Sequence, residues 1–358
     1  IYVHIPFCHA KCAYCAFYSM PGTNRAAEVV RGIIDEYGRR RAELGSERVA
    51  TIYFGGGTPS CLPQGLLESL CAVLPMDSAT ERTIEVNPED VTPSSARVWS
   101  GMGFNRVSMG VQSLNDIELR AVGRRHTAAQ ALRAIDTLHG AGFDNISCDL
   151  IYGLPGQTLD SWARNLSQLL AADIQHLSAY SLGYEPGTRL TAMLSAGKIK
   201  PVADDDVAEM YIFLCSEARK AGLEHYEISN FARPGFRSMH NSSYWDGTPY
   251  LGLGPAAHSL DSEGIRRASP CNVNEWLKHG AIVEEESPED VVNDTIITSL
   301  RTVDGLKIDS LPSDVASLIE KQADPYLRRG WLVRTGDTLL IPEEHWLMSD
   351  AIMRDLLI

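Results

Sequence analysis

Three of the eight cysteines lie within eight residues, in the pattern Cys8-x3-Cys12-x2-Cys15. The other five, at positions 61, 71, 148, 215 and 271, are isolated, and most fall in apolar stretches, as small core residues do. A secreted disulfide framework would instead spread an even number of cysteines over a short chain. A tight, odd-numbered cluster in a chain of 358 residues therefore predicts a metal site in a reducing compartment, and we expect a cytoplasmic protein.

Three thiolates can hold three corners of a 4Fe–4S cube. A cluster held in this way leaves its fourth iron open to a small molecule. The alternative is structural zinc, which normally takes four Cys or His ligands. His4 and His9 are close enough in sequence to complete a Cys3His set, so both kinds of metal site stay open at this point.

The elements that must position these cysteines follow a regular order. From residue 1 to about residue 200, short β-rich runs alternate with longer amphipathic runs. This alternation predicts an α/β fold with a parallel sheet and crossover helices, and six such units would form a partial barrel. We expect strands at 1–5, 50–54, 83–86, 106–109, 146–151 and 176–181, and helices at 26–44, 66–73, 128–140 and 159–171.

Unusual residues follow five of the six predicted strands. The cysteine cluster follows the first strand, glycines 55–57 follow the second, and Glu85 lies near the end of the third. Gln112 follows the fourth strand and Asp149 lies near the end of the fifth. Chemistry in parallel α/β folds gathers where the carboxyl ends of the strands open into loops. We therefore expect these residues to share one site. Glycines allow close approach of a ligand to the backbone, although a tight turn explains the triplet nearly as well.

The cysteine spacing resembles the signature of the radical S-adenosylmethionine superfamily. This resemblance implies that the open iron chelates the amino and carboxylate groups of S-adenosylmethionine, and that one electron from the cluster cleaves the sulfonium to a 5′-deoxyadenosyl radical. Residues 1–8 and 149–155 are similar to the oxygen-independent coproporphyrinogen III oxidase-like family. Residues 240–245 and 250–259 are similar to the haem-chaperone branch of that family.

By this resemblance, the three clustered cysteines carry the 4Fe–4S cluster. Glu85 could pair with the ammonium group of S-adenosylmethionine, and Arg124 could pair with its carboxylate. Gln112 and Asp149 could hydrogen-bond to the nucleoside or its ribose. The residues that fall where the family contacts S-adenosylmethionine are Tyr2, Tyr14, Gly56, Gly57, Thr58, Glu85, Gln112, Arg124 and Asp149.

Position 17 separates two functions within the family. The dehydrogenases carry a fourth cysteine two residues after the third, and this chain has Phe17, which offers no thiol chemistry. The chaperone branch usually has Phe at this place, and commonly an acidic residue where Ala16 stands here. The resemblance thus implies a haem chaperone that binds a cluster, S-adenosylmethionine and haem as cargo. The alternatives are an oxygen-independent coproporphyrinogen III dehydrogenase in porphyrin biosynthesis and a zinc-bound structural module. Expected partners are haem, an acceptor protein for haem, an electron donor for the cluster and a second copy in a homodimer.

His240 has two interpretations. Next to Tyr244 and Trp245, it could ligate haem iron while the aromatic rings pack on the macrocycle. Alternatively, His240 and Asn241 form a polar contact that docks a C-terminal domain onto the barrel, with Trp245 in the interface. Both interpretations stay open on the sequence.

We expect three regions: the barrel over 1–200, a connecting region over 201–288, and a mostly helical, winged-helix-like domain over 289–358. Winged helices often bind DNA, but residues 289–358 hold 7 Lys and Arg against 13 Asp and Glu, a net charge of −6. The whole chain has a net charge of −14, so nucleic acid is not an expected partner. No apolar run approaches the roughly 20 residues of a membrane span.

Overall fold

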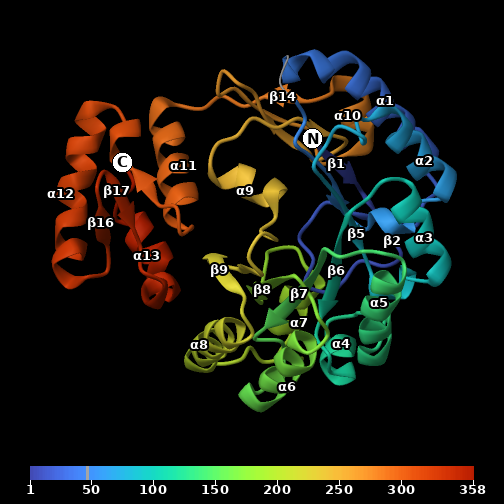
Figure 1. The fold of residues 1–358 in the computed structure, drawn as a ribbon, viewed down its shortest axis with the longest axis horizontal. Helices are drawn as coiled ribbons and strands as arrows, with labels where there is room; N and C mark the ends of the chain where they lie inside the picture. The colour runs from blue at the N-terminus through green and yellow to red at the C-terminus, as the bar shows by residue number, and fades with distance from the viewer. Residues whose placement is uncertain (46–47) are drawn as a thin grey trace.

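The computed structural model describes residues 1–45 and 48–358, and its main feature is a curved sheet flanked by helices (Figure 1). Six neighbouring strands run parallel, each connected to the next through a helical crossover, which confirms the predicted partial barrel. In order across the sheet these strands are β1 (Tyr2–Ile5), β4 (Thr51–Gly56), β5 (Glu81–Val86), β6 (Arg106–Gln112), β7 (Ile146–Tyr152) and β8 (His176–Ser181). A two-stranded ladder of β2 (Phe7–Cys8) and β3 (Met20–Pro21) follows β1 and frames the cysteine loop.

The sheet side chains alternate between an apolar outer face and a polar inner face. In β6, Val107, Met109 and Val111 are fully buried in the main apolar core. Arg106 and Ser108, on the opposite face, line the interior of the curve together with residues of the neighbouring strands. Apolar and polar residues alternate in this way because successive side chains of a strand point to opposite faces of the sheet. The outer helices bury the apolar face, and the inner face is left for polar groups.

Eight helices accompany the strands in the first 220 residues that the structure describes. The helices expected at 26–44, 66–73, 128–140 and 159–171 are α1 (Ala26–Arg40), α2 (Gln64–Val73), α5 (Ala128–Gly140) and α6 (Leu159–Leu170), and α8 (Asp204–Lys220) follows them along the chain. Three further helices were not expected from the sequence, namely α3 (Pro93–Gly101), α4 (Asp116–Ala121) and α7 (Arg189–Ser195). The signal for α3 was present in its first turn, because Thr92 and Ser95 form a reciprocal capping box ahead of Pro93.

Residues 227–254, within the expected connecting region, add strands at both edges of the sheet. β10 (Asn230–Ala232) pairs antiparallel with β8, and β9 (Glu224–Glu227) pairs with β10. At the opposite edge, β11 (Gly252–Leu253) pairs parallel with β1. Between these edges lies a helix that we did not predict, α9 (Met239–Trp245), which contacts β4 on one side and α11 (Pro288–Leu300) on the other (Figure 1).

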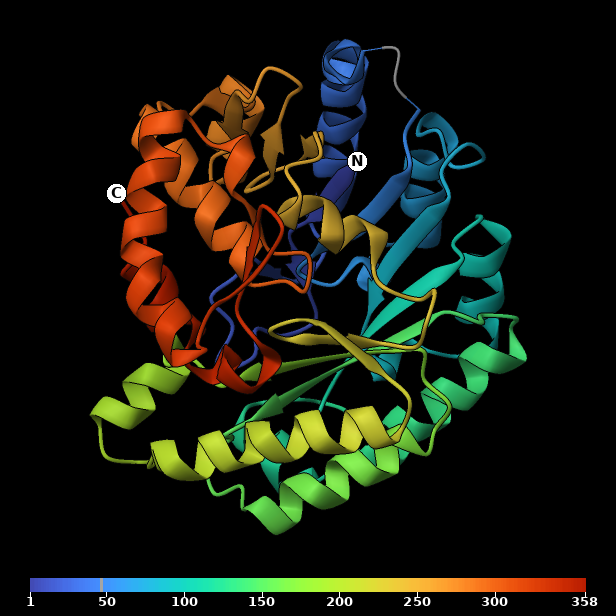
Figure 2. The same ribbon diagram turned by 60° about the vertical axis from the view of Figure 1, so that its left-hand side comes forward.

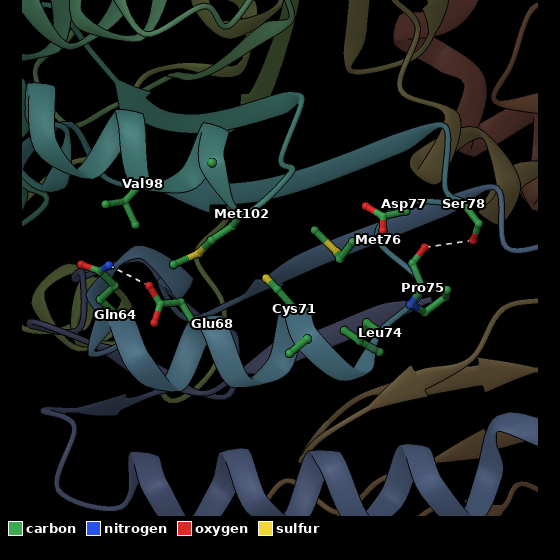
Figure 3. A pocket seen from close by; sticks show the side chains of 12 residues that line it. Gln64, Glu68, Cys71, Leu74, Pro75, Met76, Asp77, Ser78, Val98 and Met102 are labelled. Carbon is green, nitrogen blue, oxygen red and sulfur yellow. Dashed lines mark hydrogen bonds between the residues drawn. The ribbon is translucent and has the colours of Figure 1, made fainter.

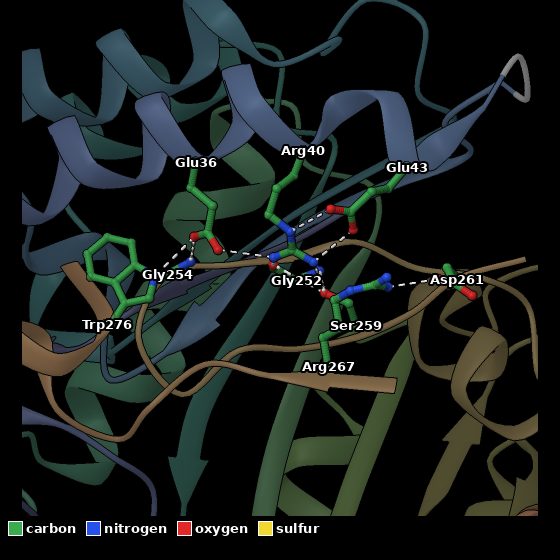
Figure 4. A network of polar contacts seen from close by, with 9 residues as sticks. All are labelled: Glu36, Arg40, Glu43, Gly252, Gly254, Ser259, Asp261, Arg267 and Trp276. Atoms are coloured by element: carbon green, nitrogen blue, oxygen red, sulfur yellow. Dashed lines mark hydrogen bonds and ion pairs between the residues drawn. The ribbon is translucent and has the colours of Figure 1, made fainter. Parts of the chain in front are cut away.

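A buried ion pair attaches β11 to α1 (Figure 4). Glu36 is 1% exposed; one of its oxygens accepts from Arg40, and the other accepts from the Gly254 backbone at 2.8 Å and from the Trp276 indole at 3.1 Å. Arg40 also donates to the Gly252 carbonyl at 3.0 Å. Every carboxylate oxygen is therefore paired, which a buried charge requires. Residues 252, 254 and 259 of the motif at 250–259 all bond to this ion pair, which gives these positions a structural role.

The segment after β11 adds a small antiparallel sheet and one helix. Its elements are β12 (His258–Leu260), β13 (Arg266–Ala268), α10 (Val273–His279) and β14 (Ile282–Val283).

The last 70 residues form a helical unit with its own apolar core (Figure 2, orange to red). Helix α11, α12 (Ser313–Arg329) and α13 (Ser349–Arg354) surround a three-stranded sheet, in agreement with the expected winged-helix-like arrangement. The strands of that sheet, in spatial order, are β15 (Leu306–Lys307), β17 (Thr338–Leu340) and β16 (Val333–Thr335). Within the described ranges, no helix is long and apolar enough to cross a membrane.

Candidate functional site

The carboxyl ends of the parallel strands open onto a cavity of about 620 Å³. All three clustered cysteines line it, as do eight of the nine residues expected to contact S-adenosylmethionine. This volume is in the usual range for a small-molecule site. The eight are Tyr14, Gly56, Gly57, Thr58, Glu85, Gln112, Arg124 and Asp149.

The three thiols suit a cluster better than a single ion. Cys8 is buried, and Cys12 and Cys15 are half-buried. A zinc ion with bonds of about 2.3 Å would hold its sulfur ligands about 4 Å apart. Among the residues whose placement is described, these three sulfurs do not form a group within 4.8 Å of one another. Three thiolates on one loop are the donors that a 4Fe–4S cluster takes, so the donor set fits such a cluster.

The two histidines considered as a fourth zinc ligand are both engaged elsewhere. Nδ1 of His4 lies 3.2 Å from the Tyr2 hydroxyl, and its Nε2 lies 3.0 Å from the Tyr18 carbonyl oxygen. Nε2 of His9 lies 2.7 Å from a carboxylate oxygen of Asp90. The geometry therefore argues against a Cys3His zinc site.

Arg124 places a positive charge beside the cysteine loop. Its Nη1 donates to the Cys12 sulfur at 3.4 Å, and its Nη2 donates to Asn87 Oδ1 at 2.7 Å and to the Gly110 carbonyl at 2.6 Å. Its buried Nε has no hydrogen-bond partner within the described chain. Because a buried donor without a partner is costly, this N–H is suited to a bound acceptor such as a carboxylate.

Two carboxylic acids face the same cavity. Glu85 accepts from the Tyr53 hydroxyl at 2.8 Å and from the Gly56 backbone at 3.1 Å. Burial raises the pKa of Glu85 to about 7 and the pKa of Asp149 to about 6. A bound cation would favour the ionised carboxylate, so both groups are prepared for a positively charged ligand.

The backbone at Gln112 is adapted to the cavity. A bulge between Gly110 and Gln112 shifts the pairing of β6 with β7, and Gln112 has a φ of +66°. A non-glycine residue in this left-handed region costs of order 1 kcal/mol and is concentrated at functional sites. The bulge brings both Gly110 and Gln112 to the cavity wall.

The glycine triplet is required by packing within the protein. A Cβ on Gly56 would lie 2.6 Å from the His4 ring, and one on Gly57 would lie 2.5 Å from the Phe7 carbonyl oxygen. Gly56 also has a φ of +106°. These contacts explain why glycine is needed here even when no ligand is bound. Gly56 and Gly57 also line the cavity.

Tyr2 is the predicted contact residue that does not line the cavity. Its ring lies 6.1 Å from those of Tyr53 and His240, and its hydroxyl lies 3.2 Å from His4 Nδ1. Sequence reasoning in turn missed Arg106, which is 1% exposed, lines the cavity and has an unpartnered Nε in the described structure. The alternation of polar and apolar residues along 106–112 is the signal that could have located it.

The surroundings of His240 favour the packing interpretation over a haem ligand. The side chain is 1% exposed, with Nδ1 at 2.7 Å from Thr51 Oγ1 and Nε2 at 2.9 Å from the Tyr244 hydroxyl. Its ring stacks on Tyr53 at 5.0 Å, and burial lowers the pKa of His240. Glu81 accepts from its backbone N–H, so α9 is tied to the beginning of β5. Both ring nitrogens already have partners, as the packing interpretation requires.

Trp245 behaves as that packing interpretation expects, whereas Asn241 does not. The Arg301 guanidinium lies 4.1 Å from the Trp245 ring centroid, which joins α9 to the C-terminal unit. Arg301 in turn donates to Glu227, on β9, at 3.2 Å. Asn241 reaches the cavity lining instead. The motif at residues 240–245 therefore connects the barrel interior to the C-terminal unit.

A second cavity, of about 700 Å³, lies beside α2 and α3 (Figure 3). Its polar side chains bond locally: Gln64 donates to Glu68 at 2.7 Å, and Ser78 donates to the Pro75 carbonyl at 3.0 Å. None of the predicted site residues lines it. The cysteine-lined cavity is therefore the candidate site.

Comparison with known proteins agrees with this site. The sequence pattern of the Radical SAM superfamily matches residues 2–169. The haem chaperone HemW of Lactococcus lactis is 34% identical, over 89% of this chain and 86% of that protein. The chain belongs to the HemW family. The haem chaperone HemW of Mycobacterium tuberculosis is 31% identical, over 100% of this chain and 94% of that protein.

The fold is also that of a solved radical SAM enzyme. Coproporphyrinogen III oxidase (HemN) from Escherichia coli superimposes with a TM-score of 0.83, over 99% of this chain and 89% of that one, at 22% identity. This likeness shows the fold. Membership of the HemW family within the radical SAM superfamily implies a 4Fe–4S cluster and S-adenosylmethionine as cofactors, and the donor set described above fits both.

Proposed function

We propose that the protein is a haem chaperone, which holds a 4Fe–4S cluster, S-adenosylmethionine and haem and passes haem to an acceptor protein. The names of its HemW relatives support this function. The observation that carries it is Phe17, which lines the candidate cavity and is 71% exposed, where the dehydrogenase branch has a fourth cysteine. An aromatic ring at this rim offers an apolar surface and no thiol.

We assign the cluster to Cys8, Cys12 and Cys15. When bound, the cluster would supply the electron that cleaves S-adenosylmethionine. The Nε of Arg124 is free to hold the ligand's carboxylate, and Glu85 is positioned to hold its ammonium group. The remaining lining residues, Gln112 and Asp149 among them, would bind the nucleoside.

The backbone around Phe17 is fixed from within the loop. Lys11 donates to the Phe17 carbonyl at 3.1 Å. The aromatic ring itself lines the cavity. A second exposed aromatic residue, Tyr180, is 43% exposed and lines the same cavity. Two aromatic rings at one mouth would suit a flat apolar ligand such as a porphyrin.

The test is anaerobic reconstitution followed by two assays on the same sample. We expect stoichiometric haem binding, followed by its Soret band, and no conversion of coproporphyrinogen III to protoporphyrinogen IX. Replacing all three cluster cysteines with alanine should abolish bound iron and sulfide, whereas a Cys61→Ala control should keep them. Repeated turnover of coproporphyrinogen, with one 5′-deoxyadenosine per hydrogen abstracted, would establish the dehydrogenase instead. The electron donor and the homodimer stay predictions.

A further inference from the structure

Three side chains that can ligate a metal meet far from the cysteine loop. Cys215 lies on α8, His225 on β9, and Glu343 begins the 3₁₀ segment Glu343–Met348 of the C-terminal unit. Their ligand atoms all lie within 4.8 Å of one another. The Cys215 sulfur is 3.8 Å from His225 Nδ1, which is 3.0 Å from Glu343 Oε1. None of the three lines the candidate cavity.

The His225 ring is held in one orientation. It stacks on Phe231 with ring centroids 4.0 Å apart, and Trp346 packs edge-on at 4.3 Å. Its Nε2 lies 3.2 Å from the Ile228 carbonyl oxygen, which can only accept. In the neutral imidazole, which has one N–H, a bond to this carbonyl places the N–H on Nε2 and leaves the Nδ1 lone pair facing Cys215 and Glu343. Histidines that ligate metals typically donate their other N–H in this way.

The carboxylate is oriented in the same manner. Arg219 donates to Glu343 Oε2 at 2.6 Å, which leaves Oε1 to face His225. A lone pair and a carboxylate oxygen 3.0 Å apart repel each other unless a cation or a proton lies between them. The Glu343 side chain is 30% exposed and that of His225 is 4% exposed, so solvent reaches the group from the carboxylate side.

We propose that Cys215, His225 and Glu343 form a binding site for a divalent transition metal, with zinc as the best fit. Zinc takes thiolate, imidazole and carboxylate ligands at about 2.0–2.3 Å, which places neighbouring donor atoms about 3–4 Å apart. Magnesium and calcium prefer an all-oxygen set, so they fit this site poorly. Three protein ligands leave a fourth zinc position for water on the exposed side.

The site would join the barrel to the C-terminal unit. Cys215 and His225 belong to α8 and to the outermost strand of the main sheet, whereas Glu343 belongs to the C-terminal unit. Backbone bonds already cross this boundary nearby, from Ile228 N to the Arg301 carbonyl and from Val303 N to the Tyr226 carbonyl, each at 3.1 Å. A bound metal would lock this contact independently of the 4Fe–4S cluster.

The experiment uses the full chain with its three cluster cysteines replaced by serine, so that added metal cannot occupy the cluster site. Titration with Zn²⁺ against a chromophoric chelator should give one tight site per chain. Titration with Co²⁺ should give a thiolate-to-cobalt charge-transfer band and the visible bands of a tetrahedral centre. Neither readout depends on haem or S-adenosylmethionine, so the result is independent of the proposed function.

In that background, Cys215→Ser should abolish the charge-transfer band and weaken zinc binding at least tenfold, and Glu343→Gln should weaken it similarly. Cys71→Ser is the matched control: like Cys215, Cys71 is half-buried on a helix, and burial raises the pKa of both thiols to about 12. The control should bind zinc normally. Absence of tight zinc binding, or affinities equal in all three variants, would overturn the site and leave a protonated His225 paired with Glu343.

Discussion

Replacing His240 with alanine distinguishes a packing residue from a haem ligand. The structure gives the ring three favourable interactions: hydrogen bonds to Thr51 at 2.7 Å and Tyr244 at 2.9 Å, and stacking on Tyr53 at 5.0 Å. Each hydroxyl left without its partner costs about 1 kcal/mol or more. Loss of the stacked pair costs about 1 kcal/mol. The variant should therefore lose about 3 kcal/mol of unfolding free energy, and the cavity that remains would add to this loss.

Urea unfolding of the cofactor-free chain, compared with wild type, measures that loss. His279→Ala is the matched control, because the His279 side chain is 45% exposed and its contact is an ion pair with Glu275 on the same helix. We expect the control to change stability by less than about 0.5 kcal/mol. We also expect the Soret band of bound haem to be unchanged in His240→Ala. A variant of wild-type stability with a shifted Soret band would refute the packing interpretation and restore His240 as an iron ligand.

Three further outcomes follow from the site and the fold. Because the pKa of Glu85 is raised to about 7, its carboxylate is protonated below pH 7. The affinity for S-adenosylmethionine, measured anaerobically by calorimetry, should therefore fall as the pH drops from 8 to 6.5. The Glu85→Gln variant should bind S-adenosylmethionine weakly, and its affinity should depend less on pH. Arg40→Ala leaves the buried Glu36 without its counter-charge, so the free energy of unfolding, measured with urea, should fall by about 3 kcal/mol. A variant of wild-type stability would mean that water replaces the guanidinium. Phe17→Cys should place a thiol at the cavity rim without producing a dehydrogenase, because one thiol does not supply the rest of a porphyrin-decarboxylating site. Sustained formation of protoporphyrinogen by this variant would contradict the prediction.

Much of the barrel could be predicted because the sequence periods there are unambiguous. The strand expected at 106–109, for example, alternates cleanly, and long amphipathic runs follow several of the strands. The residues at strand ends, such as Glu85 and Asp149, then share a cavity because parallel strands end at the same edge of a sheet. Local pattern and topology were sufficient for this part of the site.

The rest depends on contacts between distant segments, which no local pattern encodes. Helix α9 has seven residues, and what holds it is the bonding of its first turn to Glu81 together with the stacking of His240 on Tyr53. Tyr2 is diverted from the cavity by that same ring stack. Strands β10 and β11 have three and two residues, too few for a period of two to be recognised.

The edge strands set the order in which the barrel can be completed during synthesis. β1 is among the first residues of this chain, yet one of its two neighbours, β11, lies about 250 positions later, at Gly252–Leu253. Similarly, β8 gains its second neighbour only when β10 has emerged. Until then, a nascent chain carries two open sheet edges, which can pair with other chains. The sheet is therefore completed late, and the segment that supplies β10 and β11 also supplies α9, so an unfinished chain lacks both these strands and the helix that packs against β4.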